Sequence, residues 1–261
     1  MSYEFIEVAQ VDHVTFVTLN RPGVMNAINQ QMHDELQHAF DTFASDDDQY
    51  LGVIRGAGDR AFSAGSDLKA IAEAGQPNVY PASGYAGLIE RFDLNKPVIA
   101  AVDGFALGGG FEIALACDVI VATQRSSFGL PEPLVGAVAL GGGVHRLARQ
   151  IGLKQAMGMI LTAERVSAQR GFELGFVTQV VELEEFEDAV NRLVDNMLKC
   201  APLALAASKE AIMRGLDEPS LADAMREQEE YPAFHRWRRS ADAKEGPLAF
   251  AEKRTPNWQG R

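Results

Sequence analysis

Residues 97–112 read PVIAAVDGFALGGGFE: a strand, a turn and a run of glycines that leads into a helix. The apolar run 98–102 after a proline predicts a buried strand. The glycines 108–110 suit the start of a helix, where backbone N–H groups are free and a ligand can come close. The stretch thus supplies the N–H of Gly109 and the carboxylate of Glu112, three residues apart. We interpret this pair as an oxyanion site beside an acid or base.

Short apolar strands alternate with helical patterns over the first half of the chain. Apolar residues at helical spacing predict a helix from Asn29 to Phe43, and Asp67 is expected near the start of another. This order of strand, helix and strand predicts parallel strands with helical crossovers, an α/β fold. The predicted strands are 14–19, 51–55, 98–102 and 119–122.

Two segments are predicted to be loops. Residues 126–133 place Glu132 between two prolines, and a glycine-rich run over 136–143 follows before a helix. A short amphipathic helix is expected to end near Leu94. Before it, glycines and prolines predict a mobile loop over 75–87, namely Gly75, Pro77, Pro81, Gly84 and Gly87.

The second half of the chain becomes mostly helical from Leu153. Ser167 is predicted to cap a short helix that Gly175 ends, and a last strand is expected over 177–181. The composition changes near residue 195, which predicts a C-terminal helical appendage. The helical stripes are found over 186–197, 201–213 and 221–234.

Composition excludes several classes of protein. The 261 residues are 47% hydrophobic and 23% charged, with a net charge of −12. The acidic balance argues against nucleic-acid binding and against an anionic membrane surface. The chain shows no secretory segment and no apolar run of the ~20 residues that a membrane span needs, so a cytoplasmic location is expected. Cys117 and Cys200 are predicted to be inert buried thiols.

Each candidate chemical group also has a structural interpretation. Glu112 lies in an apolar helix, where a first-turn carboxylate is favoured by the helix dipole alone. Glu132, taken alone, is an ordinary solvated loop residue. The five histidines show no spacing typical of a catalytic triad or a metal site. The residues themselves therefore predict an α/β protein with a backbone oxyanion site and one or two carboxylates, without naming a substrate.

Four motifs together resemble the enoyl-CoA hydratase/isomerase (crotonase) superfamily, and their order and intervals extend the resemblance over nearly the whole chain. They are FSAGSDLK (62–69), PVIAAVDGFALGGGFEIALACD (97–118), FGLPEPLVG (128–136) and AFAEKR (249–254). Within the superfamily, residues 83–104 and 245–261 look most like carnitinyl-CoA dehydratases and neighbouring bacterial enoyl-CoA hydratases.

The resemblance implies a fold and an assembly. The fold would be the α/β ClpP/crotonase-like spiral of repeated ββα units over residues 1–195, followed by a helical oligomerisation region over 196–261. The assembly would be a homotrimer, often paired into a dimer of trimers. The implied ligand is an acyl-CoA thioester, and no metal or redox cofactor is implied, because coenzyme A is part of the substrate.

The resemblance also implies a reaction. The N–H groups of Ser66 and Gly109 would hold the thioester oxygen; the family commonly has alanine where this chain has Ser66, but the donor is main chain. Glu112 and Glu132 match the two glutamates of the hydratases. They would carry out reversible syn addition of water to a 2-enoyl-CoA, giving a 3-hydroxyacyl-CoA. Glu132 would exchange the proton at C2, and Glu112 would activate the water that adds at C3.

Further positions are carried over as contacts of coenzyme A and the acyl group. Phe250 and Lys253 would reach the coenzyme A of a neighbouring subunit, and a lysine common in the family is replaced by Gly23. The remaining contacts implied are Arg21, Val24, Asn26, Ala27, Ala64, Gly65, Asp67, Leu68, Lys69, Gly108, Gly110, Pro131 and Gly136.

Several functions remain open at this point. A carnitinyl-CoA dehydratase would share the chemistry and differ in the acyl pocket, which we expect residues 70–90 and 134–145 to line. An enoyl-CoA isomerase needs proton shuttling but no bound water, and two glutamates argue against it. A non-catalytic acyl-CoA-binding protein would be expected to have lost Glu112 or Glu132, and both are present. A serine peptidase would need a Ser–His–Asp set, which the motifs do not supply.

Overall fold

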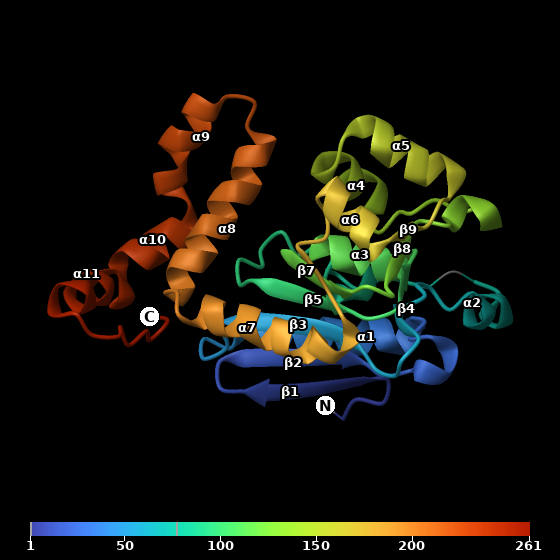
Figure 1. Cartoon of the computed structure of the whole chain (residues 1–261), viewed down its shortest axis with the longest axis horizontal. Coiled ribbons are helices and arrows are strands. Elements are labelled where there is room, and N and C mark those ends of the chain that lie inside the picture. Colours follow the sequence, from blue (N-terminus) through green and yellow to red (C-terminus); the bar gives the residue numbers. More distant parts are fainter. Residues whose placement is uncertain (1, 77) are drawn as a thin grey trace.

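The computed structural model, which describes residues 2–76 and 78–261, is built on a six-stranded sheet of order β1-β2-β3-β5-β7-β10 (Figure 1). β5 is buried along its whole length and pairs in parallel with both neighbours, as expected for a strand covered on both faces. Within this sheet, as far as the structure describes it, β1 and β2 are the one antiparallel pair. The strands are β1 (Ile6–Val11), β2 (Val14–Leu19), β3 (Leu51–Gly56), β5 (Val98–Val102), β7 (Val119–Thr123) and β10 (Gln179–Val181).

A second sheet of order β4-β6-β8-β9 makes the repeat of the fold visible. The successive pairs β3–β4, β5–β6 and β7–β8 each place one strand in the large sheet and the next in the small one, and a helix follows each pair. This confirms the predicted spiral of ββα units. The strands of the second sheet are β4 (Ala61–Ser63), β6 (Phe105–Leu107), β8 (Ser127–Gly129) and β9 (Val166–Ser167).

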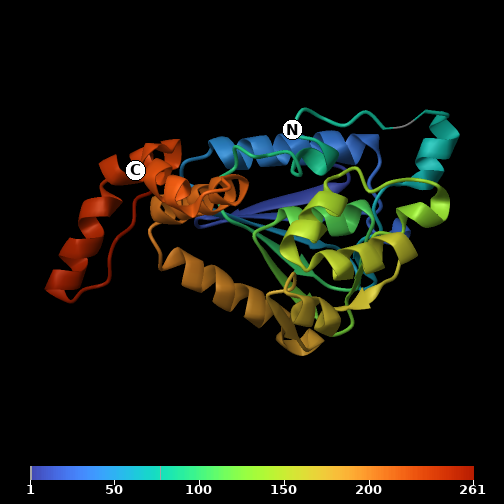
Figure 2. The same ribbon diagram turned by 90° about the horizontal axis from the view of Figure 1, so that it is seen from above.

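Helices cover both faces of the large sheet. α1 lies on one face and α7 on the other (Figure 2), and each buries its own apolar cluster. α1 begins where the Asn29 side chain accepts a hydrogen bond from the Met32 N–H at 3.0 Å. The helices are α1 (Gln30–Ser45), α2 (Leu68–Ala74), α3 (Gly109–Ala116), α4 (Gly143–Gln150), α5 (Leu153–Thr162), α6 (Ala168–Leu174), α7 (Phe186–Leu198), α8 (Pro202–Asp217), α9 (Leu221–Glu227), α10 (Pro232–Arg239) and α11 (Asp242–Glu252).

Residues 78–94, which we call the strap, differ from the prediction. The expected helix ending near Leu94 is wrong: the strap holds only a 3₁₀ turn, Tyr85–Gly87. Both Gly84 and Gly87 have positive φ, and this interrupts a helix. The prediction of a mobile loop is wrong for residues 84–87 as well, because Tyr85, Ala86 and Gly87 are buried. Pro77, part of the same prediction, lies outside the described residues.

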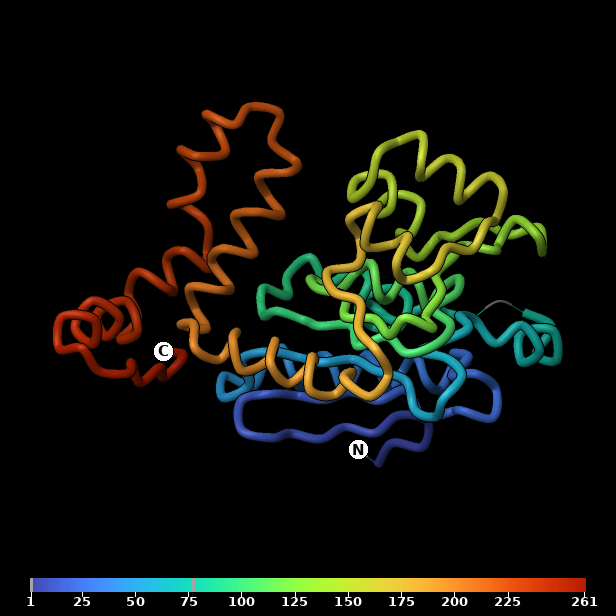
Figure 3. Tube along the Cα trace, in the orientation of Figure 1, coloured from blue at the N-terminus to red at the C-terminus, as the bar shows by residue number. Residues whose placement is uncertain are grey.

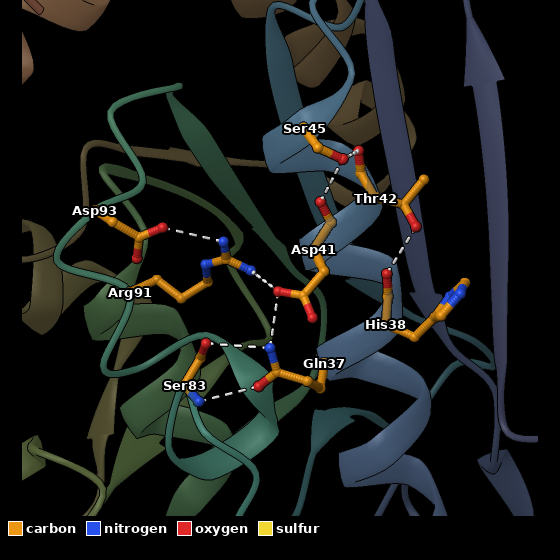
Figure 4. A network of polar contacts seen from close by, with 8 residues as sticks. All are labelled: Gln37, His38, Asp41, Thr42, Ser45, Ser83, Arg91 and Asp93. Carbon is orange, nitrogen blue, oxygen red and sulfur yellow. Dashed lines mark hydrogen bonds and ion pairs between the residues drawn. The ribbon is translucent and has the colours of Figure 1, made fainter.

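Side chains of α1 hold the strap in place (Figure 4). The Gln37 amide donates to Ser83 Oγ at 3.1 Å and accepts from the Ser83 N–H at 3.0 Å. Arg91 donates to Asp41 Oδ1 at 2.6 Å, and the Gln37 amide donates to the same oxygen at 2.8 Å. A Cβ on Gly87 would lie 2.4 Å from the Gln37 Cα. The glycine therefore lets the strap pack directly on the helix backbone.

Three smaller predictions are corrected. The loop predicted over 126–133 contains β8, which pairs with β6 and β9. The helix predicted over 221–234 is two helices, because Pro232 lacks the N–H that would continue the first, and it starts α10 instead. Cys117 is buried as expected, but Cys200 is exposed, since it follows the end of α7. The predicted helix cap at Ser167 is confirmed by its hydrogen bond from the Arg170 N–H.

The last helices, α8–α11, project from the rest of the chain and form what we call the C-terminal arm (Figure 3). The boundary predicted between residues 195 and 196 lies in the last turn of α7, which still packs on the large sheet. Lys209, halfway along α8, ties the arm to the large sheet, because its ammonium group binds the carboxylate of Asp118, just before β7, at 2.7 Å. Among the described residues, no helix is long and apolar enough to cross a membrane.

Candidate active site

Two backbone segments meet at the start of α3. Gly65 has φ +86, and a Cβ there would lie 2.9 Å from Gly109 N, so the two residues pack backbone to backbone. Gly109 is the first residue of α3, and its N–H has no acceptor within the helix. On the other segment, the N–H of Ser66, which follows Gly65, also has no hydrogen-bond acceptor in the part of the chain that the structure describes. The contact thus brings two free N–H donors close together, as an oxyanion site requires.

Glu112 is buried in the first turn of α3 and is only 3% exposed. Its Oε1 accepts a hydrogen bond from the Gly143 N–H at 2.8 Å. A Cβ on Gly141 would lie 2.4 Å from Glu112 Oε2, so the glycine-rich run before α4 closely surrounds the carboxyl. Burial raises the pKa of Glu112 to about 7, with the charge of Glu132 adding to the rise. The Gly143 N–H opposes this change.

Glu132 begins the 3₁₀ turn Glu132–Val135 that follows β8. Its Oε2 is buried and has no hydrogen-bond partner among the described residues. A Cβ on Gly108 would lie 3.0 Å from Glu132 Oε1, so the carboxyl lies against the residue that precedes α3. Burial raises the pKa of Glu132. An unpartnered buried oxygen in a carboxyl of raised pKa is suited to meet a ligand or a water molecule.

The residues expected to bind coenzyme A form two groups. Val24, Leu68 and Lys69 are exposed, and the last two begin α2, shortly after Ser66. Arg21 and Asn26 instead bind the protein. Arg21 pairs with Asp67 Oδ2 at 2.9 Å, and the buried Asn26 amide binds the Arg21 N–H and two backbone carbonyls. They shape the loop that would hold the ligand.

Four other residues expected to contact coenzyme A or the acyl group have different surroundings. Gly110 is a packing position, because a Cβ there would lie 2.3 Å from the Ser63 carbonyl oxygen. Gly136 ends the turn that carries Glu132. Phe250 and Lys253 are exposed on α11 and at its end, with Phe250 88% exposed. Figure 1 shows α11 at one end of the molecule, well away from α3, so one chain does not bring these two residues to its own site. The described residues hold no group of three or more His, Cys, Asp or Glu arranged for a metal.

The sequence analysis missed an aromatic cluster at this site. Tyr85 of the strap lies against Gly109, and its ring meets those of His33 and Tyr80 edge to face at 4.6 and 5.4 Å. His33 Nδ1 accepts from the Ala86 N–H at 2.9 Å, and burial lowers the pKa of His33 to about 4. The histidine is therefore a neutral support for the strap. A tyrosine between Gly84 and Gly87 was the available signal, since glycines flanking an aromatic residue permit close packing.

The sequence profile described as "Enoyl-CoA hydratase/isomerase" matches residues 10–261. The chain belongs to this family. Among curated relatives, it is 43% identical to the carnitinyl-CoA dehydratase of Proteus mirabilis over 248 residues, which cover 94% of each chain. It is also 43% identical to the carnitinyl-CoA dehydratase of Salmonella enteritidis over 251 residues, again 94% of each chain.

Solved structures of the family superpose closely on this chain. The enoyl-CoA hydratase of Mycobacterium tuberculosis has a TM-score of 0.91 at 38% identity and covers 98% of this chain and 99% of its own. The enoyl-CoA hydratase of Mycobacterium marinum has a TM-score of 0.90 at 40% identity, with the same coverage. The chain thus has the crotonase fold expected from its motifs.

Proposed function

We propose that this protein is an enoyl-CoA hydratase, which adds water reversibly to a 2-enoyl-CoA thioester. The observation that carries the proposal is the placement of Glu112 and Glu132. Glu112 lies in the first turn of α3, and the Glu132 carboxyl lies against Gly108, the residue before that helix. Two free backbone N–H groups lie at the same helix end. Hydration needs this combination, because one carboxyl must give a proton, the other must take one, and charge develops on the thioester oxygen.

The steps follow from the environment of each carboxyl. The Gly143 N–H favours the ionised form of Glu112, which takes a proton from water as the water oxygen bonds to C3. The C2–C3 π electrons move toward the thioester, and the N–H groups of Ser66 and Gly109 stabilise the enolate-like oxygen. Glu132, without a hydrogen-bond donor on Oε2, carries the proton that C2 receives. Proton exchange between the carboxyls through solvent then restores the starting state.

The same site also supports the proposals on coenzyme A binding and on cofactors. Exposed Leu68 and Lys69 at the start of α2 lie where coenzyme A would reach the oxyanion site, and the ammonium group suits a phosphate. The two carboxyls supply both proton transfers of the hydration, and the two N–H donors stabilise the charge that develops on the thioester oxygen. We therefore propose that the reaction uses no metal or redox cofactor.

The proposal is tested by following the absorbance of the conjugated thioester with purified protein. Crotonyl-CoA and crotonobetainyl-CoA are supplied in parallel reactions. Consumption of crotonyl-CoA with formation of 3-hydroxybutyryl-CoA is the expected result. If neither thioester is consumed although both bind, the hydratase proposal is wrong.

A second candidate is a carnitinyl-CoA dehydratase, named for the curated relatives at 43% identity. Tyr80 gives this candidate structural support. Tyr80 is 48% exposed, and its ring meets the Tyr85 ring edge to face, so an aromatic face borders the site. Burial raises the pKa of the Tyr80 phenol, and the charge of Glu112 adds to the rise. An electron-rich ring beside a carboxylate suits the trimethylammonium group of a carnitinyl chain. Turnover of crotonobetainyl-CoA without turnover of crotonyl-CoA would favour this candidate.

We also propose that the protein assembles as a homotrimer through the C-terminal arm. α8 buries few of its side chains, and apolar residues line its outer surface together with α9. Groups of exposed apolar residues on neighbouring helices are typical of protein interfaces. Light scattering on the purified protein is expected to give three chains, or six if trimers pair, and a monomer would contradict the proposal. The exposed residues are Ile212, Met213, Leu216, Leu221 and Met225.

The pH dependence of hydration follows from the shared proton. Only the pair with one proton can both give and take, and that proton exchanges between the two carboxyls. The pKa of about 7 at Glu112 marks the pH above which the pair as a whole is expected to lose it. We expect kcat/KM to fall above about pH 7, by roughly tenfold per pH unit, as loss of a single proton requires.

A variant of α4 tests this explanation. The charge of Arg146 lowers the pKa of Glu112, so Arg146→Gln is expected to move the alkaline limit of activity to higher pH. Arg149→Gln, an exposed change on the same helix, serves as the control and should leave the limit unchanged. A rise of kcat/KM through pH 7–8 would contradict the shared proton.

A further inference from the structure

The Tyr85 phenol lies between the two residues whose N–H groups form the oxyanion site. Ser66 Oγ donates a hydrogen bond to Tyr85 Oη at 3.3 Å. From the other side, a Cβ added to Gly109 would lie 2.3 Å from both Cζ and Oη of Tyr85. The hydroxyl therefore touches both oxyanion residues at once, beside the place where a thioester oxygen is to be bound.

The proton of this phenol is free to be donated. Ser66 is the donor in their hydrogen bond, and no acceptor for the Tyr85 proton is found in the described part of the chain. The side chain is 2% exposed, and a buried hydroxyl proton without an acceptor is costly. Burial raises the pKa of the phenol far above its usual range, and the charges of Glu112 and Glu132 raise it further. Tyr85 is thus a neutral donor beside Ser66 and Gly109.

The strap fixes the phenol before any ligand arrives. The His33 ring meets the Tyr85 ring at an interplanar angle of 82°, and His33 also holds the Ala86 N–H. The Gln37 amide holds Ser83 through two hydrogen bonds, as Figure 4 shows. A donor that is already held in position needs little reorganisation free energy when charge develops nearby.

We propose that the Tyr85 hydroxyl is a third hydrogen-bond donor to the thioester oxygen, beside the N–H groups of Ser66 and Gly109. This inference rests on the proposed function, since it assigns a further catalytic residue to the same site. As water adds at C3, negative charge grows on the thioester oxygen, and the phenol donates to it while Ser66 continues to donate to the phenol oxygen. No proton is transferred from Tyr85, so the balance of the reaction is unchanged.

Tyr85→Phe separates this role from simple packing, because phenylalanine keeps the ring and removes only the hydroxyl. We expect kcat/KM for crotonyl-CoA to fall about 10- to 100-fold, mostly in kcat, since the bond strengthens in the transition state. Tyr50→Phe is the matched control, since Tyr50 stacks on His13 instead, and its activity should equal that of the wild type. Equal melting temperatures for wild type and Tyr85→Phe would exclude a loss of folded protein.

A spectroscopic readout tests the donor without turnover. 4-Dimethylaminocinnamoyl-CoA absorbs at longer wavelength when its carbonyl is polarised, so its red shift on binding reports the donors at the oxygen. The shift is expected to be smaller in Tyr85→Phe than in the wild type and in Tyr50→Phe. Unchanged kcat/KM together with an unchanged shift would overturn the inference. A wild type inactive toward both thioesters, with a shift that depends on Tyr85, would instead refute the hydratase proposal and leave the third donor standing.

Discussion

Glu112→Gln is expected to lower kcat for crotonyl-CoA hydration about 10³-fold or more, near the upper range of general acid–base effects. The amide can still accept the Gly143 N–H through its oxygen, so the glycine-rich run before α4 should keep its place. What is lost is the ability to take a proton from water. Glu132→Gln is expected to cause a loss of similar size, because C2 then has no proton donor. Steady-state kinetics on both variants provide the measurement.

The double variant tests more directly whether Glu112 and Glu132 act as one unit in proton transfer. When two groups act as one unit, removing either of them already removes the catalytic effect of both. The double variant Glu112→Gln/Glu132→Gln should therefore be about as inactive as either single variant. Glu187→Gln is the control, since this exposed carboxylate is on α7 and pairs with Arg55 of β3. Retention of more than about a tenth of the wild-type rate in either single variant would contradict a proton-transfer role of the size expected for such a group.

Gly109→Ala is expected to lower kcat/KM about 10²- to 10³-fold, the size of effect seen when an oxyanion donor is removed. The reason is geometric, because the new methyl group would lie 2.3 Å from Tyr85 Cζ and Oη. Either the phenol or the first turn of α3 must then move, and both belong to the oxyanion site. The same overpacking should lower the free energy of unfolding by about 1–3 kcal/mol. Kinetics and urea unfolding measure the two effects separately.

Gly158→Ala is the matched control for this variant. Gly158 lies inside α5, and a Cβ there meets nothing within 4 Å. Alanine is the better helix former, so this change should raise the free energy of unfolding by up to about 1 kcal/mol and leave activity intact. If Gly109→Ala behaved like Gly158→Ala, the close contact between Gly109 and Tyr85 would have no role in catalysis.

Local sequence patterns predicted most of the elements. The apolar run 98–102 is a central strand, and Asp67 and Ser167 cap helices as expected, because a cap depends on residues within one turn. The helix predicted from Asn29 is also present, and Asn29 caps it. The strap was predicted wrongly because its conformation depends on residues far away in the sequence. Its apolar residues are spaced like a helix, yet its backbone follows hydrogen bonds to side chains of α1 that are about 50 residues away in sequence.

The amino-acid sequence by itself determined the order of strands and helices, the glycine run at 108–110, and the presence of both Glu112 and Glu132. Only the tertiary structure decided what these groups can do. Glu112 owes its raised pKa to burial beneath the glycines before α4 and to Glu132, which lies 20 residues further along the chain. Tyr85 reaches Gly109 only because α1 holds the strap. Proton affinity and donor geometry depend on which distant groups exclude water and share hydrogen bonds, and no local pattern specifies them.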